Sequence, residues 1–493
     1  MPHLHSDRTD QHAKVYPFYQ RALYVAGVIL ACRTLSGVFA AFTPLEHPHI
    51  WRQTDTLGVT LRFWSRWTLE PATATPWFIP AVLNSGDHGG YMPMEAPFLN
   101  LLLAPCFAAG PTYGVPLARL CILMLHLCAW WGILAAWRNK TILGLPARSA
   151  FFFLPAVGMG SLYFTKFIPD VLANALALIA VGLAWQRTHM LSAFLLATVA
   201  LLSKPTAGIT FLLCLLHPQG IRGMLAMTQW GIPATLLGIL YYTFGTEWMR
   251  ETFTDTAELF KIAPKPLIQG MGEFFSQPLL AFNLIANDFL FPGGLFATAL
   301  LAIVSWQSHH MPLRPFLSLG AVLSLQICCI AALDGEHSFG HTYYYLGVMP
   351  TLTLMLTHIL RAVSTVNAHA HANKFFILFC LLWVGANINT IATEISAYIP
   401  ALQRGRLAQK ECSQLIHAHP QLPWQQGFTF RSDFERYPSL GLCFGERQNS
   451  QLAEYGFYWK QSRLPPGCYT LDTSPHLRLI HCPPATTIGQ LPQ

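Results

Sequence analysis

Residues 22–42 read ALYVAGVILACRTLSGVFAAF, and the polar cluster WRQTDT follows them at positions 51–56. The first stretch is long enough to cross a bilayer as a helix, because about 20 apolar residues span the hydrocarbon core. The second stretch places Arg52, Gln53 and Asp55 where such a span would leave the membrane. Ionisable groups are costly at that boundary, so the cluster predicts a reaction site that faces the membrane surface.

Asp55 also has a purely structural explanation. It directly precedes a helix predicted from Thr56 to Thr68, where its carboxylate could accept backbone N–H groups as an N-cap. Position alone does not separate the two roles, so the polar residues elsewhere in the chain must decide between them.

The whole chain has the composition of a polytopic membrane protein. It is 53% hydrophobic and 11% charged over 493 residues, with 33 Phe and 14 Trp. Its mean hydropathy of +0.38 is too high for an ordinary soluble domain. The apolar segment Ala96–Ala109 is short and is predicted to lie at the interface. About eleven segments are predicted to span the membrane: 22–42, 115–137, 148–164, 169–186, 190–203, 205–217, 223–243, 289–306, 315–333, 343–361 and 374–393.

The basic residues set the orientation of these spans. With the N-terminus inside, each predicted cytoplasmic loop (138–148, 186–189, 217–222, 307–314 and 361–374) carries Lys or Arg, as the positive-inside rule requires. The net charge of +7 does not indicate nucleic-acid binding, because the basic residues are scattered among the spans and form no stripe. This orientation collects the following ionisable residues on the outer side: Asp55, Glu95, Lys166, Asp170, Lys204, Glu336 and His341.

Residues 394–493 differ from the rest of the chain in their sequence pattern, because long apolar runs are replaced by short ones. Short β-prone runs at 428–430, 440–444, 455–459, 468–471 and 477–480 are separated by Gly, Pro and Ser. Four of the 12 cysteines lie there, and an even number predicts two disulfides of undetermined connectivity among Cys412, Cys443, Cys468 and Cys482.

Two domains are therefore expected. Residues 1–393 would form the membrane domain, with a first outer loop at 43–97. Residues 394–493 would form a small extracytoplasmic α/β or β-rich domain, because disulfides form in oxidising compartments.

The outer side of such a protein suits a particular chemistry. A polar loop, acids and bases at span ends and no nucleotide-binding motif suggest a transferase that takes a lipid-linked donor from the bilayer. A polyprenyl-phosphate sugar supplies the activated carbon and the leaving group in one molecule. Its phosphate leaves without a proton donor when cations are near. The reaction then needs one carboxylate to take the proton of the acceptor hydroxyl.

Residues 47–56, HPHIWRQTDT, resemble the W-R-Q-x-D-T signature in the first outer loop of bacterial GT-C glycosyltransferases related to the aminoarabinose and protein O-mannosyl transferases. The resemblance covers roughly residues 20–390. Ala96 interrupts the family's E-F-P pattern, and the cysteine-containing tail matches no domain of the family. Four further segments resemble family motifs in the same order: Met94–Phe98 (E-F-P-L), Ile168–Asp170 (P-D), Leu202–Pro205 (K-P) and His341–Pro350 (H-x-Y-Y…P).

The resemblance implies an all-α polytopic membrane protein of GT-C type and an inverting glycosyltransferase activity. Asp55 would be the catalytic base or would orient the acceptor, and Asp170 would be a second catalytic acid. Arg52 and Lys204 would bind the donor phosphate. The remaining predicted substrate-binding residues are Gln53, Glu95, His341 and Tyr344. A divalent metal is an option within the superfamily, and no metal ligand is assigned.

Several of these residues also have structural explanations. Asp170 follows Pro169 at the start of a span, where an acid complements the helix dipole. Lys204 could snorkel from a helix end. Tyr343–Tyr345 could belong to an interfacial aromatic belt.

The expected partners are a polyprenyl-phosphate sugar, an acceptor that is a glycan, lipid or protein, and membrane lipid. The expected location is the bacterial inner membrane, within the cell envelope. Two alternatives stay open. A flippase or transporter for polyprenyl-linked glycans would place its functional polar groups at the bilayer midplane. A ligase or polymerase would keep the same donor and change only the acceptor.

Overall fold

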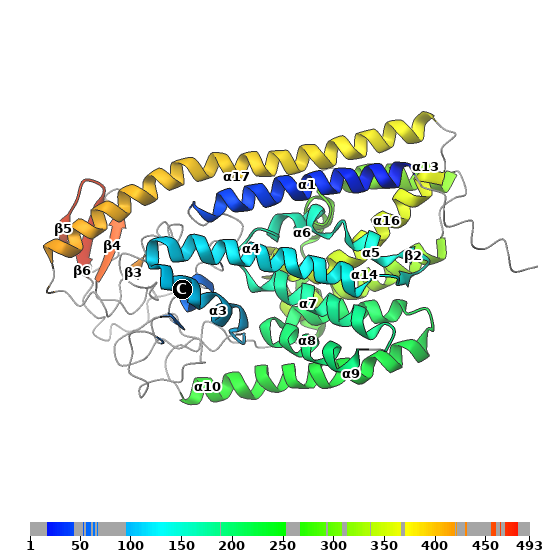
Figure 1. Cartoon of the computed structure of the whole chain (residues 1–493), viewed down its shortest axis with the longest axis horizontal. Helices are drawn as coiled ribbons and strands as arrows, with labels where there is room; N and C mark the ends of the chain where they lie inside the picture. The colour runs from blue at the N-terminus through cyan, green and yellow to red at the C-terminus, as the bar shows by residue number, and fades with distance from the viewer. Residues whose placement is uncertain are drawn as a thin grey trace, which may run out of the picture.

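A computed structural model describes most of the chain. The described residues are 17–43, 53, 56–60, 63–64, 67, 95–187, 189–252, 267–291, 294–307, 313–335, 337–365, 370–419, 421, 429–430, 455–459, 464 and 469–481. They form an elongated helical bundle with a small β-sheet at one end (Figure 1).

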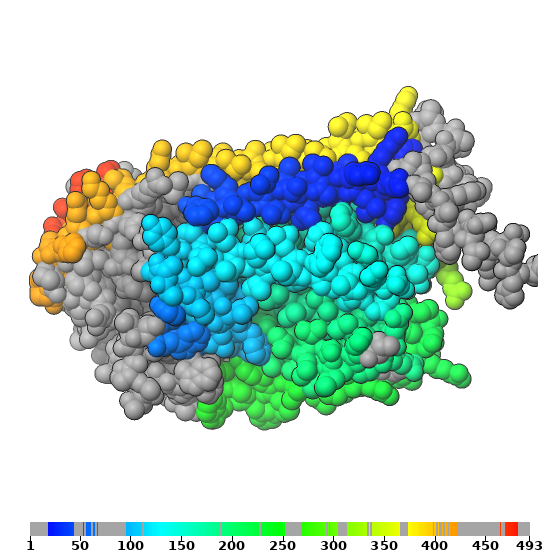
Figure 2. All heavy atoms as spheres, in the orientation of Figure 1, coloured from blue at the N-terminus to red at the C-terminus, as the bar shows by residue number. Residues whose placement is uncertain are grey.

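Long helices that run along the bundle make up its frame. They are α1 (Pro17–Ala41), α4 (Pro111–Ala136), α7 (Pro169–Ala184), α8 (Met190–Ser203), α9 (Ile221–Leu240), α13 (Gly294–Gln307), α14 (Leu313–Asp334), α16 (Met349–Thr365) and α17 (Ala370–Ala418). The shorter helices are α3 (Phe98–Leu103), α5 (Ala147–Phe151), α6 (Gly158–Tyr163), α10 (Thr246–Thr252), α11 (Leu267–Phe275), α12 (Pro278–Asn283) and α15 (His337–Gly340). Figure 2 shows α1 and α4 packed side by side on one face, in blue and cyan.

The apolar helices lie where the sequence predicted them. Among the helices in the described part of the chain, five are long and apolar enough to cross a membrane: Phe18–Ala41, Tyr113–Ala136, Leu313–Ala332, Thr342–Ser364 and Asn373–Ala397. Each coincides with a predicted span. Shorter apolar helices cover 98–109, 169–184, 190–203 and 205–216. The expected all-α polytopic fold class is therefore confirmed, while the count of about eleven spans stays a prediction.

The predicted span 148–164 is not one continuous helix. It consists of α5, the 3₁₀ turn η4 (Leu154–Ala156) and α6. Pro155 lies at the start of η4, where it cannot donate to a preceding α-helical turn. Gly158 then adopts a φ of +49°, a conformation that residues with a side chain avoid.

Two other predicted spans also contain 3₁₀ structure. Residues 205–217 form the 3₁₀ helix η5 (Pro205–Leu216), and the span at 343–361 begins as the 3₁₀ helix η9 (Thr342–Val348). Two π-helical turns, η6 (Tyr241–Gly245) and η8 (Leu284–Asp288), lie in the long segment between α9 and α13.

Gln326 on α14 binds backbone groups of both 3₁₀ helices. Its Nε2 donates to the carbonyl oxygens of Ile209 in η5, at 3.2 Å, and Gly347 in η9, at 3.3 Å. Its Oε1 accepts a hydrogen bond of 2.8 Å from Thr351. Lipid offers no hydrogen-bond partners, so irregular backbone at membrane depth must be satisfied by protein groups. Gln326 thereby joins η5, which follows Lys204, to η9, which contains Tyr343 and Tyr344.

The C-terminal strands form a four-stranded sheet with the order β3-β4-β6-β5. Its strands are β3 (Thr429–Phe430), β4 (Tyr455–Trp459), β5 (Tyr469–Thr473) and β6 (Leu477–His481). β3 pairs in parallel with β4, and the other pairs are antiparallel. A separate two-stranded hairpin joins β1 (Thr141–Ile142) and β2 (Leu145–Pro146). Four predicted β-prone runs thus match strands, and the run at 440–444 lies outside the described residues.

The cysteines of the described residues fall into two groups. Eight are free, and all of them belong to the helical part of the chain. Cys412 on α17 is disulfide-bonded, as predicted. Cys443, Cys468 and Cys482 lie outside the described residues, so the predicted pairing stays open.

Helix α17 docks against the sheet through Glu411. Its Oε2 accepts hydrogen bonds from Ser474 Oγ at 2.6 Å, His476 N at 2.9 Å and Leu477 N at 3.1 Å. Burial alone would raise the pKa of Glu411, but the hydrogen bonds from Ser474 and His476 outweigh it and hold the pKa below its usual value. A second contact joins His419 Nε2 to Asp472 Oδ2 at 2.8 Å.

The docking of α17 should weaken in acid. A carboxyl whose pKa is depressed on folding stabilises the folded state above its unfolded pKa, and this contribution is lost as the pH falls through the folded pKa. We expect the protection of amides in 469–481 against hydrogen exchange, relative to the intrinsic exchange rate at each pH, to be high at pH 7 and to fall below about pH 4, near the ordinary carboxyl range. Glu411→Gln should already exchange faster at pH 7, whereas the exposed neighbour change Lys410→Gln should not. Equal exchange in wild type and Glu411→Gln at both pH values would contradict this account.

Gly158 allows a close approach between two segments of the bundle. A Cβ atom at this position would lie 2.1 Å from the carbonyl oxygen of Phe289 and 2.8 Å from that of Asp288. The residue at 158 must therefore be glycine for α6 to pack against the backbone that follows η8.

Gly158→Ala should destabilise the protein by about 2–5 kcal/mol, combining the strain of a positive φ with overpacking against backbone. The measurement is the thermal unfolding midpoint of purified protein in detergent. Gly231→Ala, within α9, is the matched control, because nothing lies within 4 Å of its added Cβ. An unchanged midpoint in Gly158→Ala would contradict the packing described here.

Candidate active site

Lys204 lies at the centre of the candidate site because Pro205 ends the helix before it. A residue that precedes proline is pushed out of the helical region. Lys204 accordingly adopts φ −162° and ψ 117° at the end of α8. The carbonyl oxygen of Leu202, left over from the last helical turn, accepts hydrogen bonds from Ala96 N at 2.9 Å and Tyr242 Oη at 2.8 Å. The segment before α3 is thereby held beside Lys204.

Two carboxylates converge on the Lys204 ammonium. Glu95 Oε1 lies 2.5 Å from Nζ, and Asp170 Oδ1 lies 3.7 Å from it. Asp170 occupies the first turn of α7, directly after Pro169 at the helix start. Its side chain is fully buried, whereas that of Glu95 is 13% exposed. Asp170 therefore lies both at the positive end of the α7 dipole and within ion-pair distance of the ammonium.

Aromatic rings cover the same ammonium from η9. Lys204 Nζ lies 5.4 Å from the ring centre of Tyr343 and 5.3 Å from that of Tyr344. The imidazole of His341 stacks on Tyr344 with centroids 5.3 Å apart. Electron-rich ring faces stabilise a cation where water is scarce. Residues from three other parts of the chain therefore surround the Lys204 ammonium: Glu95, Asp170 and the η9 segment.

The polar cluster at 51–56, in the loop predicted to lie outside, reaches the same region through Gln53. Gln53 is buried, and its Oε1 accepts a hydrogen bond of 3.2 Å from the backbone N–H of Phe167, three residues before Asp170. Asn100 on α3 donates to the carbonyl oxygen of Thr56 at 2.7 Å. Residues 56–60 are helical, in agreement with the helix predicted to start at Thr56. Arg52 and Asp55 lie outside the described residues, so their roles stay predictions.

A second buried charge cluster adjoins this one, and its pairing was not predicted. Glu394 on α17 lies 2.9 Å from Lys166 Nζ and 3.5 Å from Arg33 Nη1. Arg33 Nε also donates to Ser161 Oγ at 2.9 Å and to Asn387 Oδ1 at 3.3 Å. The signals in the sequence were Arg33 inside the first apolar run and Glu394 at the end of the last one.

The structure brings most of the predicted site residues together, and two of them lie outside the described residues. Glu95, Asp170, Lys204, His341 and Tyr344 are brought together, and Gln53 anchors its loop to the turn before Asp170. The Lys204 ammonium, predicted to bind phosphate, is already paired with two carboxylates and covered by two aromatic rings. Within the described residues no group of three His, Cys, Asp or Glu side chains is arranged to hold a metal ion.

Comparison with solved structures finds distant likenesses, and three of them are described here. ArnT from Cupriavidus metallidurans in the apo state aligns at 14% identity and TM-score 0.45, over 73% of this chain and 62% of that chain. The same protein bound to undecaprenyl phosphate aligns at 14% and 0.44, over 94% and 98%. The oligosaccharyltransferase AglB from Archaeoglobus fulgidus, in complex with an inhibitory peptide and a dolichol-phosphate, aligns at 13% and 0.41, over 86% and 64%.

No protein-family model matches the chain, and a search of curated proteins by sequence finds no match either. At these identities and TM-scores the structural likenesses carry no argument, so the reaction must be argued from the residues themselves.

Removing the charge of Glu394 should destabilise the bundle, because it leaves Arg33 and Lys166 buried without their carboxylate. Breaking one partner of a buried ion pair costs about 3–5 kcal/mol. We expect Glu394→Gln to lower the thermal unfolding midpoint markedly. Glu251→Gln, at an exposed carboxylate on α10, is the control and should leave the midpoint unchanged. Equal midpoints for the two variants would show that the Glu394 carboxylate does not stabilise the folded protein.

Proposed function

We propose that this protein is an inverting glycosyltransferase that moves a sugar from a polyprenyl-phosphate donor to an acceptor hydroxyl on the extracytoplasmic side of a membrane. The observation that carries the proposal is the convergence of Glu95 and Asp170 on Lys204 beneath Tyr343 and Tyr344. Ionisable groups buried among apolar spans are expensive and mark functional sites by default. The lipid-linked donor is taken from the motif resemblance in the sequence.

In this reaction the acceptor oxygen attacks the anomeric carbon, and the bond from that carbon to the phosphate oxygen breaks. The polyprenyl phosphate leaves with the electron pair, and the acceptor proton passes to a carboxylate. Inversion follows from a single displacement. Asp55 is our proposed base, because it belongs to the loop that Gln53 joins to the turn before Asp170.

Asp170 suits a supporting role in the same step. It is fully buried, so its carboxylate is placed to hold the Lys204 ammonium rather than to meet an acceptor from solution. Glu95 is the more exposed of the two acids on Lys204. A donor phosphate that displaced the Glu95 carboxylate would find the ammonium already oriented by Asp170. Arg52 is the second proposed phosphate ligand.

A flippase or transporter is less well supported. Transport sites at the midplane need polar groups that are available to cargo. The polar groups of Gln326 are instead already hydrogen-bonded within the protein: Nε2 donates to the carbonyl oxygens of Ile209 and Gly347, and Oε1 accepts from Thr351. A ligase or polymerase differs only in the acceptor, and the site favours neither over simple transfer. A bacterial inner membrane, with residues 394–493 outside it, remains our proposed location.

Asp55→Asn should lower transfer by about 100- to 10,000-fold while leaving the protein folded, because Asn keeps the shape and capping ability of Asp but cannot take a proton. The measurement is consumption of polyprenyl-phosphate sugars from a panel, beside the thermal unfolding midpoint. Glu251→Gln is the matched control and should retain activity.

Two further variants separate the roles within the site. Lys204→Ala should weaken use of the phosphate-linked donor whichever acid is the base. Asp170→Asn should reduce turnover less than Asp55→Asn. Wild-type turnover in Asp55→Asn would eliminate its catalytic assignment, and a large loss in Asp170→Asn alone would move the base role to Asp170.

A further inference from the structure

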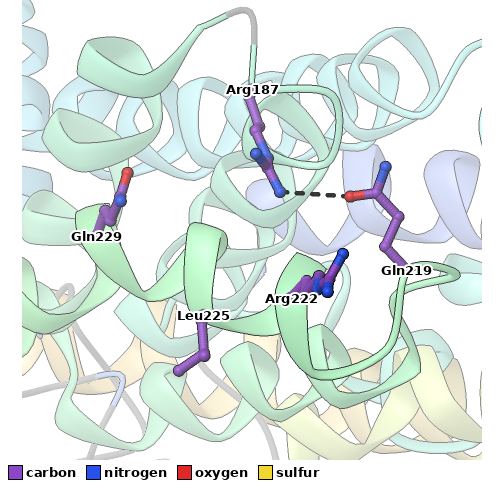
Figure 3. Close-up of a pocket in the computed structure, with 5 residues that line it drawn as sticks. All are labelled: Arg187, Gln219, Arg222, Leu225 and Gln229. Carbon is purple, nitrogen blue, oxygen red and sulfur yellow. Dashed lines mark hydrogen bonds between the residues drawn. The ribbon is translucent and has the colours of Figure 1, made fainter.

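An open pocket of about 680 Å³ lies at the end of the bundle opposite to Lys204, lined by Arg187, Gln219, Arg222, Leu225 and Gln229 (Figure 3). Arg187 follows the end of α7, whose first turn holds Asp170. The 16 residues of α7 separate the two sites by roughly 24 Å, at 1.5 Å per residue. This pocket therefore has no part in the candidate active site.

The pocket has a structured floor that His217 holds in place. The His217 Nδ1 accepts a hydrogen bond of 3.2 Å from the backbone N–H of Gln219, and Nε2 donates to the carbonyl oxygen of Trp185 at 3.1 Å. Gly223 presses against this ring so closely that a Cβ would lie 1.8 Å from Nδ1. The turn after η5 and the turn after α7 are thereby fixed against each other.

The charge of the pocket is not neutralised by its own part of the chain. Arg187 Nη2 donates to Gln219 Oε1 at 3.3 Å, and the two side chains point toward one another (Figure 3). Within the described residues Arg222 makes no hydrogen bond or ion pair. Asp170 is the one acidic residue between Glu95 and Glu247, and it lies at the far end of α7. Two guanidinium groups and two amides thus face an open volume with no carboxylate from the surrounding helices.

Exposed apolar side chains include Leu225, which lines the pocket, and residues close in sequence to its arginines: Ile221 before Arg222, and Leu191 four positions after Arg187. Leu225 is 56% exposed, Ile221 is 72% exposed and Leu191, on the neighbouring helix α8, is 70% exposed. On a helix that spans a membrane such side chains face lipid tails. The pocket therefore lies where a helix surface that suits acyl chains meets a pair of arginines that suit an anion.

We propose that this pocket binds the phosphate of an anionic phospholipid headgroup. Arginine forks bind phosphate oxygens through paired, charge-assisted hydrogen bonds. Gln219 and Gln229 supply amide donors for the remaining headgroup oxygens, and the acyl chains lie along Leu191, Ile221 and Leu225. Basic pockets between membrane helices are known to hold anionic headgroups in this way. The site requires neither the proposed donor nor the proposed reaction.

The experiment compares the full-length protein in nanodiscs of phosphatidylcholine alone and with added phosphatidylglycerol. We expect phosphatidylglycerol to raise the unfolding midpoint of the wild type, because a ligand that binds only the folded state stabilises it. In the double variant Arg187→Gln, Arg222→Gln the affinity for phosphatidylglycerol should fall about 10- to 30-fold, since each arginine near a membrane surface contributes about 1 kcal/mol.

The control is Arg138→Gln, which removes an exposed charge at the same end of the bundle, where Trp137 contacts Trp185 at 5.0 Å. It should keep the phosphatidylglycerol response. An equal response in wild type and double variant would overturn the proposal, and so would an equal loss in Arg138→Gln. A second arm adds inorganic phosphate to phosphatidylcholine nanodiscs. If soluble phosphate stabilises the wild type as much as phosphatidylglycerol does, the site is one for soluble anions and the lipid assignment is wrong.

Discussion

The Lys204 ammonium is the charge around which one end of the bundle is arranged. Pro205 forces its backbone out of the helix, and the side chain leaves α8 where Glu95 and Asp170 can reach it. Without the cation these two carboxylates would repel each other in surroundings that are poor in water. Segments from before α3, the start of α7 and η9 are thus tied to one atom, although they lie more than a hundred residues apart in places.

The two charge clusters complement each other. Lys204 faces two carboxylates, whereas Glu394 faces two cations, Lys166 and Arg33. The short segment from Lys166 to Asp170 joins them, so the excess negative charge of one lies near the excess positive charge of the other. Gln326 also joins distant segments, but through hydrogen bonds rather than charges: its side chain donates to carbonyl oxygens of η5 and η9. A bundle with several interrupted helices can persist in lipid because such groups take the place of water.

Much of this arrangement was predictable from local patterns. Apolar length located the helices, and the alternation of basic loops placed Glu95, Asp170 and Lys204 on one side, where the structure brings them together. The interruption of 148–164 had visible signals in Pro155 and Gly158, but the length of the apolar run outweighed them in the prediction. Helix α17 continues past residue 393 to Ala418 and accommodates both Pro400 and Gly405 in its interior.

The pairings themselves could not be predicted. Arg33, Lys166 and Glu394 come from three distant elements, and their contact depends on how α1 and α17 pack together. Nothing in the spacing of these residues indicates which carboxylate neutralises which cation. The docking of Glu411 against β6 is of the same kind, because backbone N–H groups leave no signature in the sequence.

The length of α17 turns it into a lever. Its apolar stretch ends at Ala397, and the helix continues to Ala418. At 1.5 Å per residue this extension projects roughly 32 Å beyond the apolar part, about as far as a bilayer core is thick. A small tilt of the embedded half therefore becomes a displacement of several ångströms at the sheet. Pro400, which cannot donate to the carbonyl of Ser396, lies near the fulcrum and is where such a lever would flex.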